Sequence, residues 1–409
     1  MYYEMITENK FDYRLKWIEK FDPDVFDGIK AITYDGLNYE NKKTKIFAYI
    51  GFPKGDGPFP AVVLLHGGGG HAYPHWIKLW NERGFAAIAM DNTGFYPAED
   101  GHESEWSEEK EKIYKKKWQH KIHKSLEEDG YTAMPDNDCM KTSEQAVDRQ
   151  WMFHAVGASI IANNILRDDP RVIKEKIGIC GISWGGVIAS VTIGFDNRYA
   201  FAIPIYGSGY LNEGMGWMSN YFGSDMKNSN WRAENRFKNT HMPMLWHCWN
   251  DDAAFSINAN SRSYSATLKN NRKTLLSIVD NMDHGHLAAW KRDEPLFFAE
   301  CICGDSRSMP KISEDGKIDY ENMECISARL FYTKTPYKYH LCKKNGEEEL
   351  PYMDGEWETA EAHIENGKLT APIHESICAY YYEVLLKKDG KSIVFSTPLK
   401  KNDSIKMEN

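Results

Sequence analysis

The sequence predicts an α/β protein: a mostly parallel, doubly wound sheet followed by a small all-β, sandwich-like domain. Two observations carry this prediction. From residue 61 to residue 301, continuous apolar runs of strand length alternate with helical segments, as in parallel sheets covered on both faces. After about residue 310, only short alternating segments separated by turns remain. We therefore expect two domains, residues 1–310 and residues 311–409.

The composition limits the classes of partner. The 409 residues carry a formal net charge of −9, which predicts no basic surface for nucleic acid or for an anionic membrane. No apolar run reaches the roughly 18 residues of a transmembrane helix. The first residues lack the pattern of a signal peptide, and the eight cysteines are scattered. We therefore expect a cytoplasmic protein with reduced thiols, and the sequence leaves a homo-oligomer open.

The first elements form the leading edge of the sheet. Residues 11–20 predict a short helix, and residues 29–34 and 44–52 predict two antiparallel strands. The apolar run 61–65 predicts the first buried parallel strand. An amphipathic helix over residues 74–83 and a buried strand over 85–90 complete this part of the α/β order.

The strand at residues 61–65 ends in His66 and four glycines, Gly67 to Gly70. Glycines let backbone N–H groups approach a ligand closely, which suits a phosphate or an oxyanion. No Gly-Lys-Ser/Thr follows, so the loop lacks the decisive residues of a phosphate-binding loop. The pattern favours an oxyanion loop over a flexible glycine hinge.

The segment Gly181-Ile182-Ser183-Trp184-Gly185 lies between an apolar strand, residues 176–182, and a helix that begins near residue 187. A strand, a sharp glycine-flanked turn and a helix are the context of a nucleophile elbow, which exposes the serine hydroxyl above the sheet. Ser183 is therefore the candidate nucleophile.

Two insertions rich in aromatic residues interrupt the α/β order. Residues 97–142, which include Trp106, are a candidate lid, and residues 207–231, which include Tyr210 and Trp217, form a second loop on the same face. A long helix over residues 143–167 separates the first insertion from the elbow strand. Tyrosine and tryptophan rings suit stacking on sugars, so these three aromatic residues are candidate substrate-binding residues.

A serine hydroxyl needs an imidazole to take its proton, and the imidazole needs a carboxylate on its other nitrogen. The chain supplies both groups after the nucleophile. The strand at residues 244–249 ends in Asp251 and Asp252, and the strand at 274–279 is followed by His284 and His286. This order of serine, acid and histidine is that of α/β-hydrolases.

With these motifs the chain resembles α/β-hydrolases of the dienelactone hydrolase and acetyl xylan esterase group, related to the hydrolase module of prolyl oligopeptidases. The resemblance covers about residues 45–305 and implies the α/β-hydrolase fold. It implies Ser183 as nucleophile and the backbone N–H groups of Trp184 and of Gly68 or its neighbour as the oxyanion hole. It favours Asp252 over Asp251 from the position of Pro243, and His286 over His284 because a glycine precedes it.

The resemblance also implies the reaction. We expect a serine hydrolase that removes short acyl groups, above all acetyl, from a carbohydrate or another small alcohol, with no cofactor and no metal ion. Dienelactone hydrolases proper use a cysteine nucleophile, which Ser183 does not match. Two further alternatives are a serine peptidase of the prolyl oligopeptidase type and a non-catalytic carbohydrate-binding protein.

Overall fold

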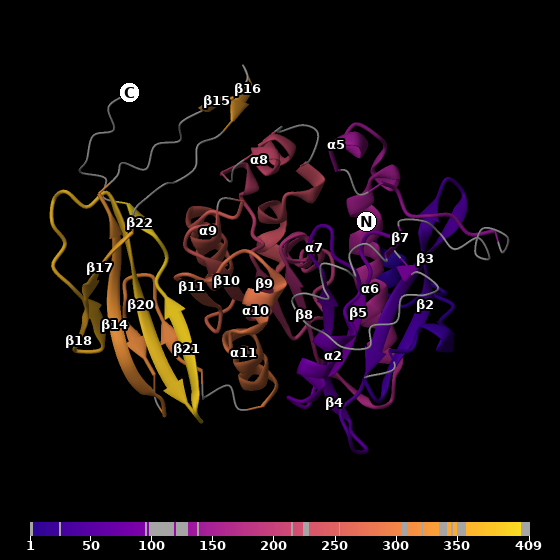
Figure 1. Ribbon diagram of the computed structural model, residues 1–409, viewed down its shortest axis with the longest axis horizontal. Helices are drawn as coiled ribbons and strands as arrows, with labels where there is room; N and C mark the ends of the chain where they lie inside the picture. The colour runs from indigo at the N-terminus through magenta and orange to yellow at the C-terminus, as the bar shows by residue number, and fades with distance from the viewer. Residues whose placement is uncertain are drawn as a thin grey trace. The chain divides into compact units, whose positions relative to one another are not determined.

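The structure, a computed structural model, forms two compact units, Met1–Pro204 and Ile205–Asn409 (Figure 1). It describes residues 3–23, 26–94, 96–97, 118–119, 130–136, 139–213, 216–223, 229–252, 254–304, 309–320, 322–334, 342–344, 347–349 and 357–401. Most of the candidate lid, including Trp106, lies outside these residues. The predicted division of the chain at residue 310 stays a prediction.

The first unit is built on a mixed sheet with the strand order β1-β2-β3-β5-β4-β8-β9. Its first strands pair antiparallel, whereas β4 pairs parallel with both β5 and β8. The carboxyl ends of β4, β5 and β8 therefore point the same way, and the glycine loop after β4 and the turn at Ser183 leave from the same edge. The strands are β1 (Lys16–Trp17), β2 (Ile29–Tyr39), β3 (Lys42–Gly51), β4 (Phe59–Leu65), β5 (Ala86–Met90), β8 (Val172–Ile182) and β9 (Phe201–Ile205).

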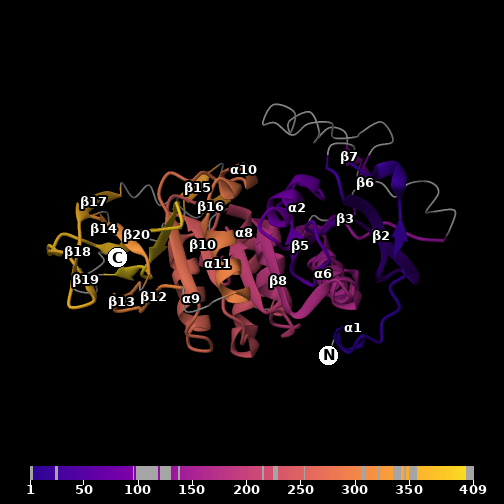
Figure 2. The ribbon, with the colours of Figure 1, turned by 90° about the horizontal axis from the view of Figure 1, so that it is seen from below.

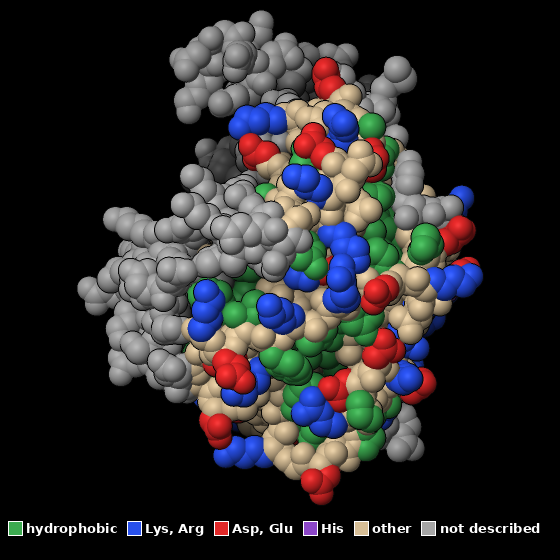
Figure 3. All heavy atoms as spheres, turned by 90° about the vertical axis from the view of Figure 1, so that its right-hand side faces the viewer, with side chains coloured by type: hydrophobic (Ala, Val, Ile, Leu, Met, Phe, Trp, Pro, Cys, Tyr) green, Lys and Arg blue, Asp and Glu red, His purple; other side chains and the backbone are tan. Residues whose placement is uncertain are grey.

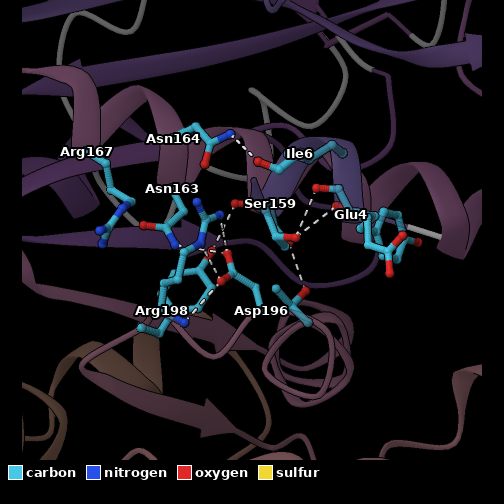
Figure 4. Close-up of polar contacts among 12 residues, drawn as sticks. Glu4, Ile6, Ser159, Asn163, Asn164, Arg167, Asp196 and Arg198 are labelled. Atoms are coloured by element: carbon cyan, nitrogen blue, oxygen red, sulfur yellow. Dashed lines mark hydrogen bonds and ion pairs between the residues drawn. The ribbon is translucent and has the colours of Figure 1, made fainter. Parts of the chain in front are cut away.

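Helices cover this sheet on both faces: Figure 2 shows α2 (Pro74–Asn81) and α6 (Trp151–Asp168) on opposite sides of it. The helix α7 (Trp184–Thr192) packs beside α6. A buried polar network joins α6 to its neighbours (Figure 4). In it, Asn163 donates to Asp196, and Asn164 donates to the carbonyl of Ile6 in the short helix α1 (Glu4–Thr7).

Two helices that the sequence predicts differ in the structure: one is absent, and the other begins later. Residues 11–20 do not form a helix: β1 pairs there with β2, and a 3₁₀ turn, η1 (Glu19–Phe21), follows. The long helix predicted from residue 143 begins instead at Trp151, after a 3₁₀ turn, η2 (Val147–Arg149). The short helix α5 (Cys139–Thr142) and the paired strands β6 (Tyr96–Pro97) and β7 (Trp118–Gln119) come before it.

The second unit continues the α/β order. The end of β9 pairs parallel with β10 (Leu245–Trp249), which pairs parallel with β11 (Leu275–Val279). A serine N-cap begins α9 (Ile257–Leu268), because Ser256 Oγ accepts a hydrogen bond from Ala259 N at 3.2 Å. The other helical segments are η3 (Leu211–Glu213), α8 (Gly216–Gly223), η4 (Ser229–Trp231), η5 (Ala233–Asn239), α10 (His286–Trp290) and α11 (Glu294–Cys303).

The second unit also holds the predicted C-terminal β region. Its main sheet has the order β17-β14-β20-β21, with β22 paired to β20, and every pair is antiparallel. The strands of this sheet are β14 (Glu324–Thr333), β17 (Glu358–Glu361), β20 (Ala379–Lys388), β21 (Lys391–Ser396) and β22 (Lys400–Lys401). The described residues of this region also form three small antiparallel ladders: β12 (Lys311–Ile312) with β13 (Ile318–Asp319), β15 (Cys342–Lys344) with β16 (Glu347–Glu349), and β18 (His363–Glu365) with β19 (Lys368–Thr370). The mostly parallel α/β sheet and the separate antiparallel strands are thus confirmed.

The strand β21 is fastened to β11 by side-chain and backbone hydrogen bonds. Ser396 Oγ accepts from Ile278 N at 3.1 Å and donates to Ile278 O at 3.3 Å. Glu294, whose side chain is fully buried, accepts from Val394 N at 2.8 Å and pairs with Arg292. The C-terminal strands therefore share buried polar groups with the α/β part of this unit.

The surface is mixed in charge where Figure 3 shows it: basic and acidic side chains alternate there, with apolar side chains between them. Among the described residues, no helix is both long enough and apolar enough to cross a lipid bilayer.

Candidate active site

Ser183 lies at the sharp turn between β8 and α7, with the backbone angles φ 57° and ψ −119°. This left-handed conformation is strained for a residue with a side chain. Two glycines make the turn sterically feasible. A Cβ on Gly181 would lie 2.1 Å from Gly185 O, and a Cβ on Gly185 would lie 2.1 Å from Leu65 O. The local geometry is therefore that of the predicted nucleophile elbow.

The glycine loop after β4 lies against this elbow. A Cβ built on Gly67 would come within 3.1 Å of Ser183 Cβ, and one on Gly68 within 2.8 Å of the Trp184 indole ring. A side chain at either position would therefore require Ser183 or the Trp184 ring to shift. The two predicted oxyanion donors, Trp184 N and Gly68 N, thus belong to segments in direct contact beside the serine.

A hydrogen-bond clamp that the sequence analysis did not predict holds the start of this loop. His66 Nε2 accepts from Asn92 N at 3.0 Å, and Asn92 Nδ2 donates to His66 O at 2.8 Å. Since Nε2 accepts, the proton belongs on Nδ1, which lies 2.8 Å from Gly67 O. Trp151 Nε1 donates to Asn92 O at 2.6 Å, and its ring meets the Trp184 ring edge-on. The only signal for this clamp was the position of Asn92 just after a buried strand.

In the second unit, Asp252 and His284 form a hydrogen-bonded pair. Asp252 Oδ2 lies 2.6 Å from His284 Nδ1, and the aspartate side chain is 2% exposed. Asp252 Oδ1 accepts from the backbone N–H groups of Ala254 and Phe255 at 2.9 and 3.1 Å. With its carboxylate so engaged, Asp252 acts as the acceptor for His284 Nδ1–H, which leaves Nε2 as the basic nitrogen.

Two aromatic rings fix the plane of His284. The Phe255 ring is stacked on the imidazole with centroids 5.7 Å apart, and the Tyr206 ring lies 4.7 Å away at a tilt of 36°. Tyr206 Oη in turn donates to Asp283 O at 2.7 Å, and burial raises the pKa of Tyr206, so it stays a neutral donor. Neither ring was predicted from the sequence.

The other predicted residues lie as follows. Asp251 is half-buried in the turn after β10, and His286 is the first residue of α10. The Tyr210 ring stacks on the Arg262 guanidinium at 3.9 Å. The side chain of Trp217, in α8, lies outside what the structure describes.

The cysteine nearest to the elbow is not a rival nucleophile. Cys180 lies fully buried in β8, and this burial raises the pKa of its thiol well above the ordinary value. A thiol that remains protonated inside the sheet cannot attack a carbonyl carbon.

The described residues hold no group of three histidine, cysteine, aspartate or glutamate side chains arranged to bind a metal ion.

The family model described as the dienelactone hydrolase family matches residues 46–295 of the chain. No curated protein sequence matches the chain.

Several solved structures are similar at low identity. The acetyl xylan esterase from Paenibacillus sp. R4 is 18% identical, with a TM-score of 0.48, over 73% of this chain and 91% of that one. Acetyl xylan esterase 1 from Thermoanaerobacterium sp. JW/SL YS485 is 13% identical, with a TM-score of 0.46, over 73% and 92%. The acylaminoacyl peptidase of Pyrococcus horikoshii is 16% identical, with a TM-score of 0.43, over 64% and 38%.

Proposed function

Because the chain belongs to the dienelactone hydrolase family, we propose that it is a serine hydrolase that cleaves short-chain carboxylic esters through an acyl-enzyme. The acyl group is short, with acetyl the leading candidate, and the alcohol is a carbohydrate or another small alcohol. The sugar is the alcohol that the sequence predicts from Tyr210 and Trp217. The other aromatic side chains of the segment 207–231 are buried in the structure, namely Tyr221, Phe222 and Trp231.

The observation that carries this proposal is the backbone of Ser183. A serine held at φ 57° between two glycines that admit no Cβ is strained. Such strain persists only where the surrounding structure imposes it, and it is concentrated at functional sites. A glycine would relieve the strain, so the serine hydroxyl itself is the feature that needs explanation.

The mechanism assigns a role to each group. Ser183 Oγ attacks the ester carbonyl carbon while His284 Nε2 takes its proton, and the N–H groups of Trp184 and Gly68 stabilise the oxyanion. The alcohol departs with that proton, and water then repeats the attack on the acyl-enzyme. The loss of one oxyanion donor typically costs about 3 kcal/mol of transition-state stabilisation.

The proposed base is His284, the alternative of the sequence analysis, in place of His286. Its support is the 2.6 Å hydrogen bond to Asp252, because a general base of this kind needs a carboxylate on its other nitrogen. The proposal requires His284 Nε2 to reach Ser183 Oγ during the reaction, and His286 remains the comparison in every experiment.

The test is hydrolysis of p-nitrophenyl acetate and butyrate by the wild type and by Ser183→Ala. We expect the wild type to prefer acetate and the variant to lose at least 10³-fold in kcat. A fluorophosphonate probe should label the wild type on one residue, identified as Ser183 by peptide mass spectrometry.

A Ser190→Ala variant is the matched control, because Ser190 is fully buried in α7 and has no proposed role. Equal rates in wild type and Ser183→Ala would disprove the nucleophile. Faster hydrolysis of an aminoacyl nitroanilide than of any ester would contradict the esterase proposal in favour of a peptidase.

A further inference from the structure

The second unit carries a groove of about 430 Å³ that neither Asp252 nor His284 lines. This volume lies within the roughly 300–1,000 Å³ of small-molecule sites. One part of its lining is a face of α9, and the rest comes from Tyr210, from the turn at Glu314 and from residues 398–400. Figure 1 shows α9 and β22, the two elements that flank it.

Hydrogen bonds fix each wall of this groove. Leu399 N donates to Ser261 Oγ at 2.9 Å, which ties residues 398–400 to α9. Tyr264 Oη donates to Ile312 O at 2.9 Å and so holds the segment that leads to the Glu314 turn. Tyr210 N donates to Glu234 Oε2 at 2.9 Å. Four separate segments are thus held in place, and the groove is preformed.

The charge of the lining is opposite to that of the whole chain. Arg262, Lys269 and Lys400 contribute three cations against the single carboxylate of Glu314, although the chain carries a net charge of −9. Arg262 and Lys269 are seven residues apart on the helix, which places them on the same face at roughly 10 Å. Two cations at this distance suit two anionic groups on one extended ligand better than a single small anion.

The remaining lining suits a sugar. Asn258 and Ser265 offer amide and hydroxyl groups, which match sugar hydroxyls, and Pro398 and Leu399 offer apolar surface for the C–H faces of a pyranose ring. The Arg262 guanidinium carbon lies over the Tyr210 ring, 3.9 Å from its centroid. This stacking orients the planar group, whose edge is suited to bidentate recognition of a carboxylate.

We propose that this groove is a second binding site, for an oligosaccharide that carries carboxylate groups, as uronates do. The choice of a carbohydrate rests on the proposed function, whereas the requirement for negative charge rests on the groove alone. The groove holds an acidic carbohydrate chain by its uronate residues, through the cations of Arg262, Lys269 and Lys400.

The experiment is isothermal titration of the Ser183→Ala protein with a galacturonic acid trimer and with the same trimer methyl-esterified. Methylation removes the negative charge of each carboxyl group and adds only a methyl group, and the variant lacks the proposed nucleophile that would hydrolyse the esters. We expect the acidic trimer to bind at least tenfold more tightly. Adding Arg262→Gln and Lys269→Gln to the Ser183→Ala protein should weaken binding of the acidic trimer at least tenfold. Lys269→Gln alone changes one exposed side chain and should weaken that binding less.

Lys387→Gln is the matched control, because Lys387 is exposed on β20 and does not line the groove. Equal binding of both trimers, or unchanged binding in the groove variants, would overturn the proposal. Equal binding of hexaglutamate would overturn the carbohydrate part of it. If the Ser183→Ala protein binds the acidic trimer but the wild type shows no esterase activity, the proposed function is refuted. The groove is then still a binding site for the acidic trimer.

Discussion

The hydrogen bond between Asp252 and His284 sets the chemistry of the imidazole. The aspartate is buried and already accepts two backbone N–H groups, so it is oriented before any substrate arrives. The stacked rings of Phe255 and Tyr206 hold the imidazole plane against rotation. A base held in one tautomer and one orientation loses little entropy on the way to the transition state.

The acid can be identified by one pair of neighbouring variants. Asp252→Asn should lower kcat for p-nitrophenyl acetate about 10³- to 10⁴-fold, because the imidazole loses the partner that fixes its tautomer. Asp251→Asn, one residue earlier, should stay within about tenfold of the wild type. Steady-state rates at pH 8 measure both, and a larger loss in Asp251→Asn would reverse the assignment.

The two histidines can be separated in the same way. His284→Gln should lose at least 10³-fold in kcat, since no base then accepts the serine proton. His286→Gln should keep most of the activity and the wild-type pH–rate profile. If His286→Gln loses activity and His284→Gln does not, the base is the residue favoured from the glycine that precedes it.

Asp35 provides a test of stability rather than activity. Burial by itself would raise its pKa, but hydrogen bonds from Lys45 and Lys43 outweigh burial, and the pKa of Asp35 is lowered. As the pH falls, Asp35 is therefore protonated at a higher pH in the unfolded chain than in the folded protein. The contribution of Asp35 is present above its ordinary pKa of 3.8 and is lost as the pH falls through the lower, folded value.

Asp35→Asn should accordingly lower the free energy of unfolding at pH 7 by about 3 kcal/mol, because the buried Lys45 loses its counter-ion. The difference from wild type should shrink below pH 3.8. Urea unfolding at pH 7 and at pH 3 measures both values. Asp12→Asn, at an exposed side chain nearby, is the control, and a constant difference across this pH range would contradict the linkage.

The sequence allowed the candidate site residues to be named, but it did not show which histidine pairs with which aspartate. Ser183 could be predicted because the glycines, the preceding strand and the following helix are local signals. The choice between His284 and His286 depends on which imidazole meets Asp252, and that is decided by a turn with positive φ at Asn281 and Asp283. The pattern of residues does not determine the path of this turn.

At the scale of elements, the elbow depends on Gly185. A Cβ there would meet a backbone carbonyl, Leu65 O, at 2.1 Å, so neither strand nor helix can yield without breaking the sheet. We expect Gly185→Ala to lower the melting temperature by more than 10 °C or to prevent folding. Gly223→Ala, at the end of α8 with open space around it, should change stability by less than about 1 kcal/mol.

Thermal unfolding followed by circular dichroism distinguishes the two glycine variants. A wild-type melting temperature for Gly185→Ala would show that the elbow can relax, and the steric account of its glycines would then be wrong.

The failed helix prediction over residues 11–20 has a tertiary cause. Tyr13 donates to Asp168, Arg14 donates to Asp35, and Trp17 pairs with Ile32 of β2. These contacts are distant in sequence, and they favour an extended chain over the local helical preference. By contrast, buried strands such as β4 and β5 are apolar on both faces and could be predicted within one or two residues.

At the scale of the molecule, the C-terminal strands are joined to the α/β part of their unit through Ser396 and Glu294. We expect Ser396→Val to lower the free energy of unfolding by about 1–3 kcal/mol, because Ile278 N and O lose a partner inside the protein. Ser392→Val, at an exposed position on the same strand, should be neutral.

Urea unfolding of both serine variants tests this joint. Equal stability of the two would mean that the C-terminal strands pack on β11 through apolar contact alone. Truncation after residue 310 would remove Val394 N, which donates to Glu294, and would uncover the surface of β11 on which β21 packs. We therefore expect that shorter chain to be poorly expressed.

The strained backbone of residue 183 implies that thermal stability and catalytic activity oppose each other at this position. Ser183→Gly would let the chain adopt the same corner without steric conflict, and we expect it to melt several degrees above the wild type while being catalytically dead. In a relative that is no longer selected for catalysis, we therefore expect glycine at this position. Such a relative should have a higher melting temperature and no hydrolase activity.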